Sequence, residues 1–217
     1  GLEAGGVRYE QGGEGKLLEA DLVLLSIGRR ANTAGIGLEA LGVATTRGAV
    51  IVDEKMRTSQ PGVWAAGDIT GFSMLAHTAY REAEVAVNDM LGLRDQMRYD
   101  AIPAVLYTSP ELASVGETEQ SARQKGLPFR TVTLPMRFSG RYLAENEGGN
   151  GIMKLVVHTG TRQVLGLQAL SNYASEFIIA AASYIEMGIG LEQIKKIVFP
   201  HPTVSEIIRE AVFQYQD

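Results

Sequence analysis

A histidine and a carboxylate five positions apart near the C-terminus form the pair of residues in this chain best suited to chemistry. They lie in the stretch His201-Pro-Thr-Val-Ser-Glu206, on either side of an expected helix start. A carboxylate that binds one imidazole nitrogen fixes the tautomer and leaves the other nitrogen free to take a proton near neutral pH. This spacing would make His201 a general base that Glu206 orients.

The same residues also fit a purely structural role. In a capping box, the side chain of Thr203 would cap the amide of residue 206, and Glu206 would reach back to the amide of Thr203. One carboxylate is not expected to serve both roles fully. The spacing alone therefore leaves the helix cap and the general base as open alternatives.

A second candidate site is the dipeptide Gly67-Asp68. Residues 63–68 read as a buried strand that stops at this dipeptide, and helical periodicity follows over residues 73–91, with Gly92 as the stop. An acidic side chain at the carboxyl end of such a strand can accept hydrogen bonds from the sugar hydroxyls of a nucleotide. Gly-Asp is also common in ordinary turns, so both interpretations stand.

The start of that helix is a third candidate. Free backbone N–H groups and the helix dipole favour an electron-rich ligand edge at the residues that begin the helix. His77 could contact a ligand there, although a structural role for its imidazole is favoured. Arg29 and Arg30 could meet phosphates or remain solvated.

The elements that position these residues change character along the chain. Strands are expected at residues 7–11 and 16–27, joined by a Gly-rich hairpin, and residues 21–27 are apolar enough for a strand buried on both faces of a parallel sheet. A short helix near residues 38–41 and a strand at 49–53 follow, before a polar stretch at 93–100. Beyond it the pattern predicts an antiparallel sheet with segregated helices, an α+β domain: strands at 104–108, 113–117, 129–134, 152–158 and 163–170, and helices at 119–125, 174–187, 191–198 and 203–215.

Composition limits the classes of function. The 217 residues carry a formal charge of -5, which argues against nucleic-acid or membrane-surface binding, and no apolar run approaches the ~20 residues of a spanning helix. The chain has no cysteine, so disulfides and Cys-ligated metals are excluded and no metal site is expected; a cytoplasmic location fits. Gly1 follows no Met, and we expect the sequence to be part of a longer chain.

Taken together, the motifs resemble a known family. Residues 20–33, 52–71, 74–77, 102–116 and 201–206 are similar, in order and spacing, to the C-terminal half of dihydrolipoamide dehydrogenases, which are flavoproteins of the pyridine nucleotide–disulfide oxidoreductase family. The chain departs from the usual pattern at Ala31, where Pro is common, and at Phe199-Pro200, where His-Ala often stands. Glutathione, mercuric and trypanothione-type reductases share much of this frame, so a reductase of another disulfide is the alternative.

The resemblance implies a role for each candidate residue. Gly67 and Asp68 would belong to the second FAD-binding signature, with Asp68 on the ribityl chain. The backbone of Leu75, Ala76 and His77 would face the pyrimidine edge of the flavin. His201, oriented by Glu206, would deprotonate a dithiol substrate in the active site of the partner subunit.

The resemblance also implies an organisation and partners. Residues 1–35 would be a remnant of the NAD-binding domain, residues 36–99 the C-terminal part of the FAD-binding domain, and residues 100–217 the interface domain of a homodimer. The expected substrate is a lipoyl-bearing protein of a 2-oxoacid dehydrogenase or glycine-cleavage complex, with FAD and NAD as cofactors. Because the cysteine pair and the NAD loop precede this region in the family, we expect the chain to be inactive alone. A non-catalytic dimerisation module is a further alternative.

Overall fold

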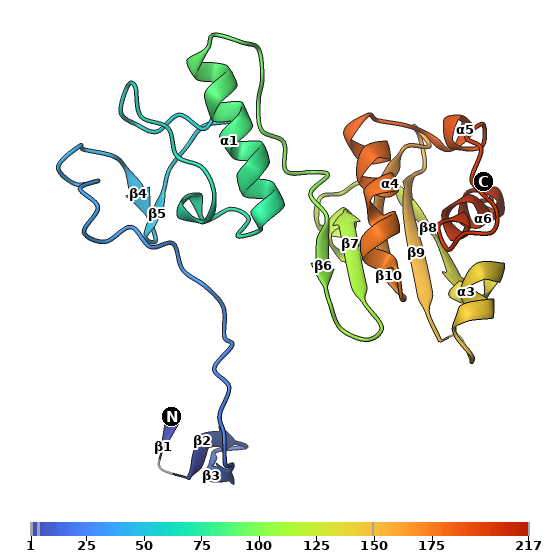
Figure 1. Cartoon of the computed structure of the whole chain (residues 1–217), viewed down its shortest axis with the longest axis horizontal. Coiled ribbons are helices and arrows are strands. Elements are labelled where there is room, and N and C mark those ends of the chain that lie inside the picture. Colours follow the sequence, from blue (N-terminus) through green and yellow to red (C-terminus); the bar gives the residue numbers. More distant parts are fainter. Residues whose placement is uncertain (1, 4, 149, 217) are drawn as a thin grey trace.

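Figure 1 shows a small N-terminal hairpin, a middle lobe around one long helix, and a larger C-terminal lobe built on a sheet. This computed structural model describes residues 2–3, 5–148 and 150–216. Gly1, the first residue of the first predicted domain, and Asp217, the last residue of the last one, lie outside the described residues. We use the term middle lobe for residues 33–99 and C-terminal lobe for residues 104–216.

The C-terminal lobe contains a five-stranded sheet in which every pairing is antiparallel. Its order in space is β6-β7-β10-β9-β8, so the hairpin formed by β9 and β10 lies between β7 and β8. This arrangement confirms the predicted α+β class. The strands are β6 (Ala104–Leu106), β7 (Leu112–Gly116), β8 (Phe129–Pro135), β9 (Ile152–His158) and β10 (Val164–Leu170).

Helices pack against this sheet and complete its core. The helix α4 (Ala174–Glu186) contacts β7 and β10, and α6 (Glu206–Gln214) contacts β8 and β9. Alternate residues of β9 point to the helices, and Leu155 is fully buried in one apolar cluster with Leu167 of β10 and Ile207 of α6. The remaining elements of this lobe are α2 (Glu119–Gln124), the 3-10 helix η2 (Met136–Phe138), α3 (Gly140–Glu145) and α5 (Leu191–Ile194).

The middle lobe is organised around one helix rather than around a sheet. The helix α1 (Ala76–Met90) buries Val85 and Ala86 against Met56 and Met97, so its inner face closes a small second cluster. Helical periodicity over residues 73–91 is confirmed, with the first turn beginning at residue 76. The other elements of this lobe are short: β4 (Thr45–Thr46), β5 (Ala49–Val50) and the 3-10 helix η1 (Asp68–Thr70).

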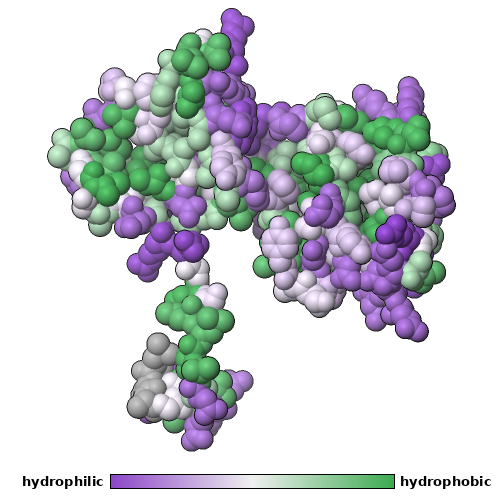
Figure 2. Space-filling model, in the orientation of Figure 1, coloured by the Kyte–Doolittle hydropathy of each residue, from purple (hydrophilic) through white to green (hydrophobic). Residues whose placement is uncertain are grey.

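The strand predicted at residues 16–27 ends at Glu19, so the prediction is wrong for its apolar part. The N-terminal hairpin forms as expected, but it ends at residue 19, and the following residues have no strand partner among those described. Leu22 and Leu24 are 92% and 91% exposed, and Figure 2 shows this apolar stretch in green between the hairpin and the middle lobe. A strand buried on both faces needs neighbours on both sides, and the described chain supplies none there. The N-terminal sheet consists of β1 (Leu2–Glu3), β2 (Gly6–Gln11) and β3 (Glu14–Glu19), of which β2 and β3 form the hairpin.

Five other local predictions need correction. Residues 63–68 form no strand beyond a single bridge between Arg57 and Trp64, because no described strand lies beside them. Residues 38–41 make turns rather than a helix, and the strand at 49–53 keeps only two residues. The helices expected at 191–198 and 203–215 are shorter, α5 ending at Ile194 and α6 beginning at Glu206. No helix in the described part of the chain is long and apolar enough to cross a membrane.

Candidate functional site

The structure brings His201 and Glu206 together at the start of α6. Nδ1 of His201 lies 3.0 Å from Oε1 and 3.2 Å from Oε2 of Glu206. Because a carboxylate only accepts hydrogen bonds, Nδ1 carries the proton and Nε2 is the nitrogen left to accept one. The imidazole is 79% exposed, whereas the Glu206 side chain is 19% exposed. The pair thus has the geometry of a base held by a half-buried carboxylate.

Glu206 also makes half of the capping box. The backbone N–H of Thr203 donates to its Oε2 at 2.8 Å, while the Thr203 hydroxyl turns away and donates to the Pro200 carbonyl instead. The Glu206 carboxylate therefore contacts both the His201 ring and the Thr203 N–H, while the side-chain half of the predicted cap does not form. The Thr203 N–H, and after it the contact with His201, hold the pKa of Glu206 below its usual value, against the opposing effect of burial.

The second candidate, Gly67-Asp68, lies on the other lobe. Gly67 is buried with φ of 84°, a conformation that favours glycine, and a Cβ there would come within 3.3 Å of the Ala79 side chain. Asp68 begins η1 with its side chain 48% exposed, and its carboxylate lies 3.8 Å from Nε of the mostly exposed Arg29. The loop is therefore fixed by a backbone that only glycine fits, and it leaves the Asp68 carboxylate accessible.

A buried carboxylate that the sequence reasoning missed holds this loop in place. Glu82 of α1 is fully buried; its Oε2 accepts the Gly67 N–H at 2.5 Å, and its Oε1 accepts the Tyr99 hydroxyl at 2.7 Å. Burial, with the contact to Glu82, raises the pKa of Tyr99. Helical spacing could have revealed Glu82, because it lies on the α1 face that also buries Thr78 and Val85.

The start of α1 is open, as the dipole argument requires. Leu75 is the N-cap, no side chain among those described caps it, and the first backbone bond of the helix runs from the Ala79 N–H to the Leu75 carbonyl. The N–H groups of Ala76 and His77 therefore precede the first intrahelical donor. An electron-rich ligand edge fits this position.

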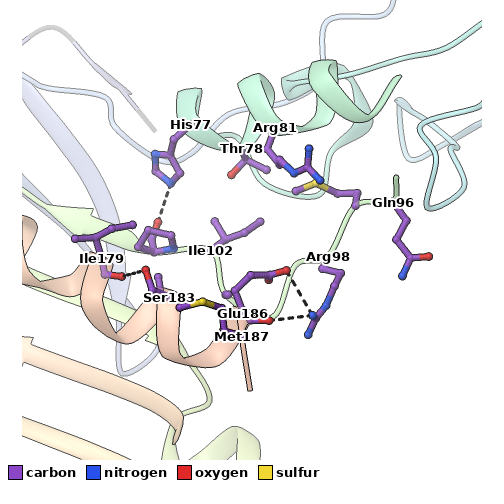
Figure 3. Close-up of a pocket in the computed structure, with 14 residues that line it drawn as sticks. His77, Thr78, Arg81, Gln96, Arg98, Ile102, Ile179, Ser183, Glu186 and Met187 are labelled. Atoms are coloured by element: carbon purple, nitrogen blue, oxygen red, sulfur yellow. Dashed lines mark hydrogen bonds and ion pairs between the residues drawn. The ribbon is translucent and has the colours of Figure 1, made fainter. Parts of the chain in front are cut away.

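The imidazole of His77 has a structural role, because it binds a backbone carbonyl of the protein. Its Nε2 lies 2.8 Å from the Pro103 carbonyl, so it donates there and joins α1 to the segment that enters the C-terminal lobe. In Figure 3 its ring lies at one side of a cavity of about 610 Å³ between α1 and α4. Arg98 closes another side by binding the Glu186 carboxylate at 3.4 Å and its backbone carbonyl at 3.3 Å. The cavity separates the two lobes and contains neither His201 nor Asp68.

The described residues offer no metal centre, since they include no cluster of three or more His, Cys, Asp or Glu that could hold an ion. Arg29 and Arg30 line one cavity of about 350 Å³ together with Arg47, and Arg29 also lies near Asp68. The two best candidates thus lie on different lobes, one presenting a proton acceptor and the other an accessible carboxylate beside an open helix start.

Comparison with known proteins places this geometry in a family. The model of the pyridine nucleotide-disulphide oxidoreductase dimerisation domain matches residues 102–212, which is half of the chain and nearly all of the C-terminal lobe. The model of the pyridine nucleotide-disulphide oxidoreductase itself matches residues 3–83. The chain belongs to the pyridine nucleotide–disulfide oxidoreductase family.

Individual relatives narrow the resemblance. The chain is 41% identical over 206 residues to a dihydrolipoyl dehydrogenase of Geobacillus stearothermophilus, a match that covers 94% of this chain and 44% of that protein. The crystal structure of LpdA from Mycobacterium tuberculosis superposes with a TM-score of 0.88 at 30% identity, over 97% of this chain and 46% of LpdA. RclA from Escherichia coli, a flavoprotein disulfide reductase crystallised with Cu(II), gives 0.86 at 26% identity, over 99% and 50%. The chain thus spans about half the length of these relatives.

Proposed function

We propose that this chain carries the acid/base residues and part of the flavin site of a dihydrolipoyl dehydrogenase that oxidises protein-bound dihydrolipoyl groups with NAD. The observation that carries the proposal is the hydrogen bond between His201 Nδ1 and Glu206, at 3.0 Å, which leaves the exposed Nε2 as a proton acceptor. The similarity to dihydrolipoyl dehydrogenases supports the choice of substrate. NADP in place of NAD would leave the role of His201 unchanged.

His201 would act on the thiol of the substrate. Nε2 takes a proton from one thiol of the dihydrolipoyl group, and Glu206 stabilises the imidazolium that forms. The resulting thiolate attacks a protein disulfide and forms a mixed disulfide with one of its sulfurs. The second thiol of the substrate then attacks this mixed disulfide, which releases the lipoyl disulfide and leaves the protein cysteines reduced to a dithiol. A flavin held by the Gly67-Asp68 loop and the start of α1 would supply the two-electron transfer from that dithiol to NAD, and the balance would be one NADH and one proton for each dihydrolipoyl group oxidised.

The reacting disulfide has to come from outside the 217 residues, because they contain no cysteine. We therefore propose that the chain alone has no thiol–disulfide turnover. Its contribution to the complete enzyme would be the dimer contact and the His201–Glu206 pair, delivered to the active site of the partner subunit. A cytoplasmic location is part of this proposal, on the same ground of cysteine content.

The proposed division into domains follows the same logic. Residues 1–35 would belong to the NAD-binding domain, residues 36–99 to the FAD-binding domain, and residues 100–217 to the interface domain. The separate apolar clusters of the middle and C-terminal lobes support the boundary near residue 100. The helices α4 and α6 are the proposed dimer contact, since Ile179 of α4 and Phe213 of α6 are exposed at 60% and 49%.

The first test replaces His201 in the complete enzyme. We expect His201→Gln to lower the turnover of dihydrolipoamide by ~10²-fold or more, the usual scale for loss of a general base. Arg123→Gln, which changes a 70% exposed charge on α2, serves as the control and should leave turnover within a factor of two or so. If His201→Gln turns over like its control, His201 is not the base.

Two measurements on the chain itself test the remaining parts. Size-exclusion chromatography with light scattering should give a dimer, and a strict monomer at micromolar concentration would contradict the interface assignment. The purified chain should be colourless, because the flavin site is incomplete. A flavin spectrum near 1:1 stoichiometry would instead show that Gly67, Asp68 and the start of α1 suffice for binding.

A second candidate is a reductase of a small disulfide, which the similarity to the disulfide reductase RclA favours. The same base would then protonate a leaving thiolate in the reverse direction. Assays of the complete enzyme with dihydrolipoamide and with a small disulfide plus NADH separate the two. A folded, flavin-loaded complete protein inactive with both would leave only a dimerisation role.

A further inference from the structure

A serine distant in sequence meets the loop that joins His201 to Glu206. Ser139 lies between η2 and α3 and is the N-cap residue of α3. It is 1% exposed, so its hydroxyl has to find partners within the protein. Its Oγ lies 3.1 Å from the Thr203 carbonyl, 64 residues further along the chain. Ser139 thus joins the middle of the C-terminal lobe to the candidate catalytic loop.

The direction of this contact is fixed by a second one. The Tyr142 N–H donates to Ser139 Oγ at 3.2 Å, which is the N-cap of α3. A hydroxyl has one proton, and the accepting side of this hydroxyl is already in use, so the proton points to the Thr203 carbonyl. Ser139 is therefore both a helix cap and a donor to the loop.

Thr203 transmits that contact to the carboxylate. Its N–H donates to Glu206 Oε2 at 2.8 Å, and its hydroxyl donates to the Pro200 carbonyl at 2.8 Å. These two bonds are local and could move together with the loop. The bond from Ser139 ties the same residue to a different element, so it restricts where the N–H that orients Glu206 can point.

We propose that Ser139 is a positioning residue for the His201–Glu206 pair, acting through Thr203 to hold the carboxylate where it fixes the imidazole. The structural part of this proposal concerns contacts within the chain, while its catalytic consequence rests on the proposed function. Loss of the Ser139 hydroxyl would let the loop drift, which lengthens the bond between the Thr203 N–H and Glu206 and loosens the hold on His201.

The ionisation of Glu206 reports this hold directly. The Thr203 N–H is the main cause of the lowered pKa of Glu206, so a looser loop should raise that pKa toward its ordinary value. We expect the carboxyl carbon resonance of Glu206, followed by NMR over an acid titration of the chain, to shift its midpoint upward in Ser139→Ala. The Thr203 amide should also exchange with solvent faster.

Ser171→Ala is the matched control. Ser171 is a fully buried serine of the same lobe whose hydroxyl donates to a backbone carbonyl, that of Asn172, at 2.7 Å. It loses a comparable hydrogen bond without touching the loop, so the Glu206 midpoint should stay at its original value. Equal shifts in the two variants, or no shift in Ser139→Ala, would overturn the proposal.

A gentler substitution keeps the test valid if loss of the cap unfolds Ser139→Ala. Ser139→Cys is close in size, and a thiol is a weak donor and weak acceptor. It should shift the Glu206 midpoint in the same direction by a smaller amount, and a midpoint identical to the original would count against the proposal.

In the complete enzyme, Ser139→Ala should lower kcat several-fold and Ser171→Ala should not. This arm separates the two proposals. If His201→Gln leaves turnover intact while Ser139→Ala still shifts the Glu206 titration, the proposed function fails and the positioning role stands. If His201→Gln is inactive but the titration does not move, the reverse holds.

Discussion

The C-terminal lobe and the segment at residues 20–27 both contain strand-like apolar sequence, but they differ in what surrounds it. In the C-terminal lobe, Leu155 and Leu167 lie on adjacent strands and are fully buried beneath α4 and α6. In the apolar segment, Leu22 and Leu24 are almost fully exposed. The difference shows that an apolar, strand-like pattern forms a stable strand only where neighbouring strands and helices cover it. Of these two regions, the described chain provides such neighbours only in the C-terminal lobe.

The middle lobe lies between these extremes. Its cluster around Met56 and Val85 is small, and its loops are held by polar contacts such as those of Glu82 rather than by a sheet. Trp64, the single tryptophan, packs against this cluster and donates to Asp89 at 3.0 Å. Its fluorescence therefore reports the middle lobe, whereas the far-ultraviolet circular dichroism is weighted toward the larger C-terminal lobe.

Replacing one leucine in each region should give the largest difference in the free energy of unfolding. Leu167→Ala should lower the free energy of unfolding by about 2–5 kcal/mol, because it leaves a cavity in a closed core. Leu22→Ala should change it by less than about 0.5 kcal/mol, because the side chain is already in water. Urea unfolding followed by circular dichroism measures both, and similar losses would mean that the apolar segment is packed.

The next effect separates the middle lobe from the C-terminal lobe. Glu82→Gln keeps one acceptor oxygen for the Gly67 N–H, but both contacts lose the carboxylate charge, and the Tyr99 hydroxyl has to accept from the new NH₂ group instead of donating. We expect a loss of about 1–3 kcal/mol in the transition seen by Trp64 fluorescence, with little change in the later C-terminal transition. The exposed Glu84→Gln on the same helix is the control. A loss shared by both transitions would show that the lobes unfold as one unit.

The smallest expected effect is the pH dependence of the middle lobe. Hydrogen bonds from Arg81, and then Asn88, hold the pKa of Asp95 at about 2. An unfolded Asp titrates near 3.9, so this carboxylate stabilises the folded lobe above pH ~4 and loses that effect as the pH falls toward 2. Asp95→Asn should flatten the stability of the Trp64 transition between pH 4 and 2. An unchanged slope would assign the acid sensitivity to other carboxylates.

Much of the C-terminal lobe was predictable from the sequence, because its contacts follow the chain closely. The β9–β10 hairpin and the end of α4 near Gly188 are set by turn residues and apolar periodicity within a few positions of one another, as is α1 in the middle lobe. The strands expected at residues 20–27 and 63–68 failed for the opposite reason. A strand forms only with hydrogen-bonded neighbours, and no local pattern shows whether these exist.

The candidate site divides in the same way. The sequence by itself determined that His201 and Glu206 stand within reach across a helix start, and that Gly67 and Asp68 form a tight acidic turn, since both depend on spacing of a few residues. The tertiary structure alone decided that the Glu206 carboxylate contacts both the imidazole and the Thr203 N–H, that Ser139 anchors this loop from 64 residues away, and that buried Glu82 fixes Gly67. Such contacts join groups that only folding brings together, and a buried polar group has to find its partner wherever the fold places it.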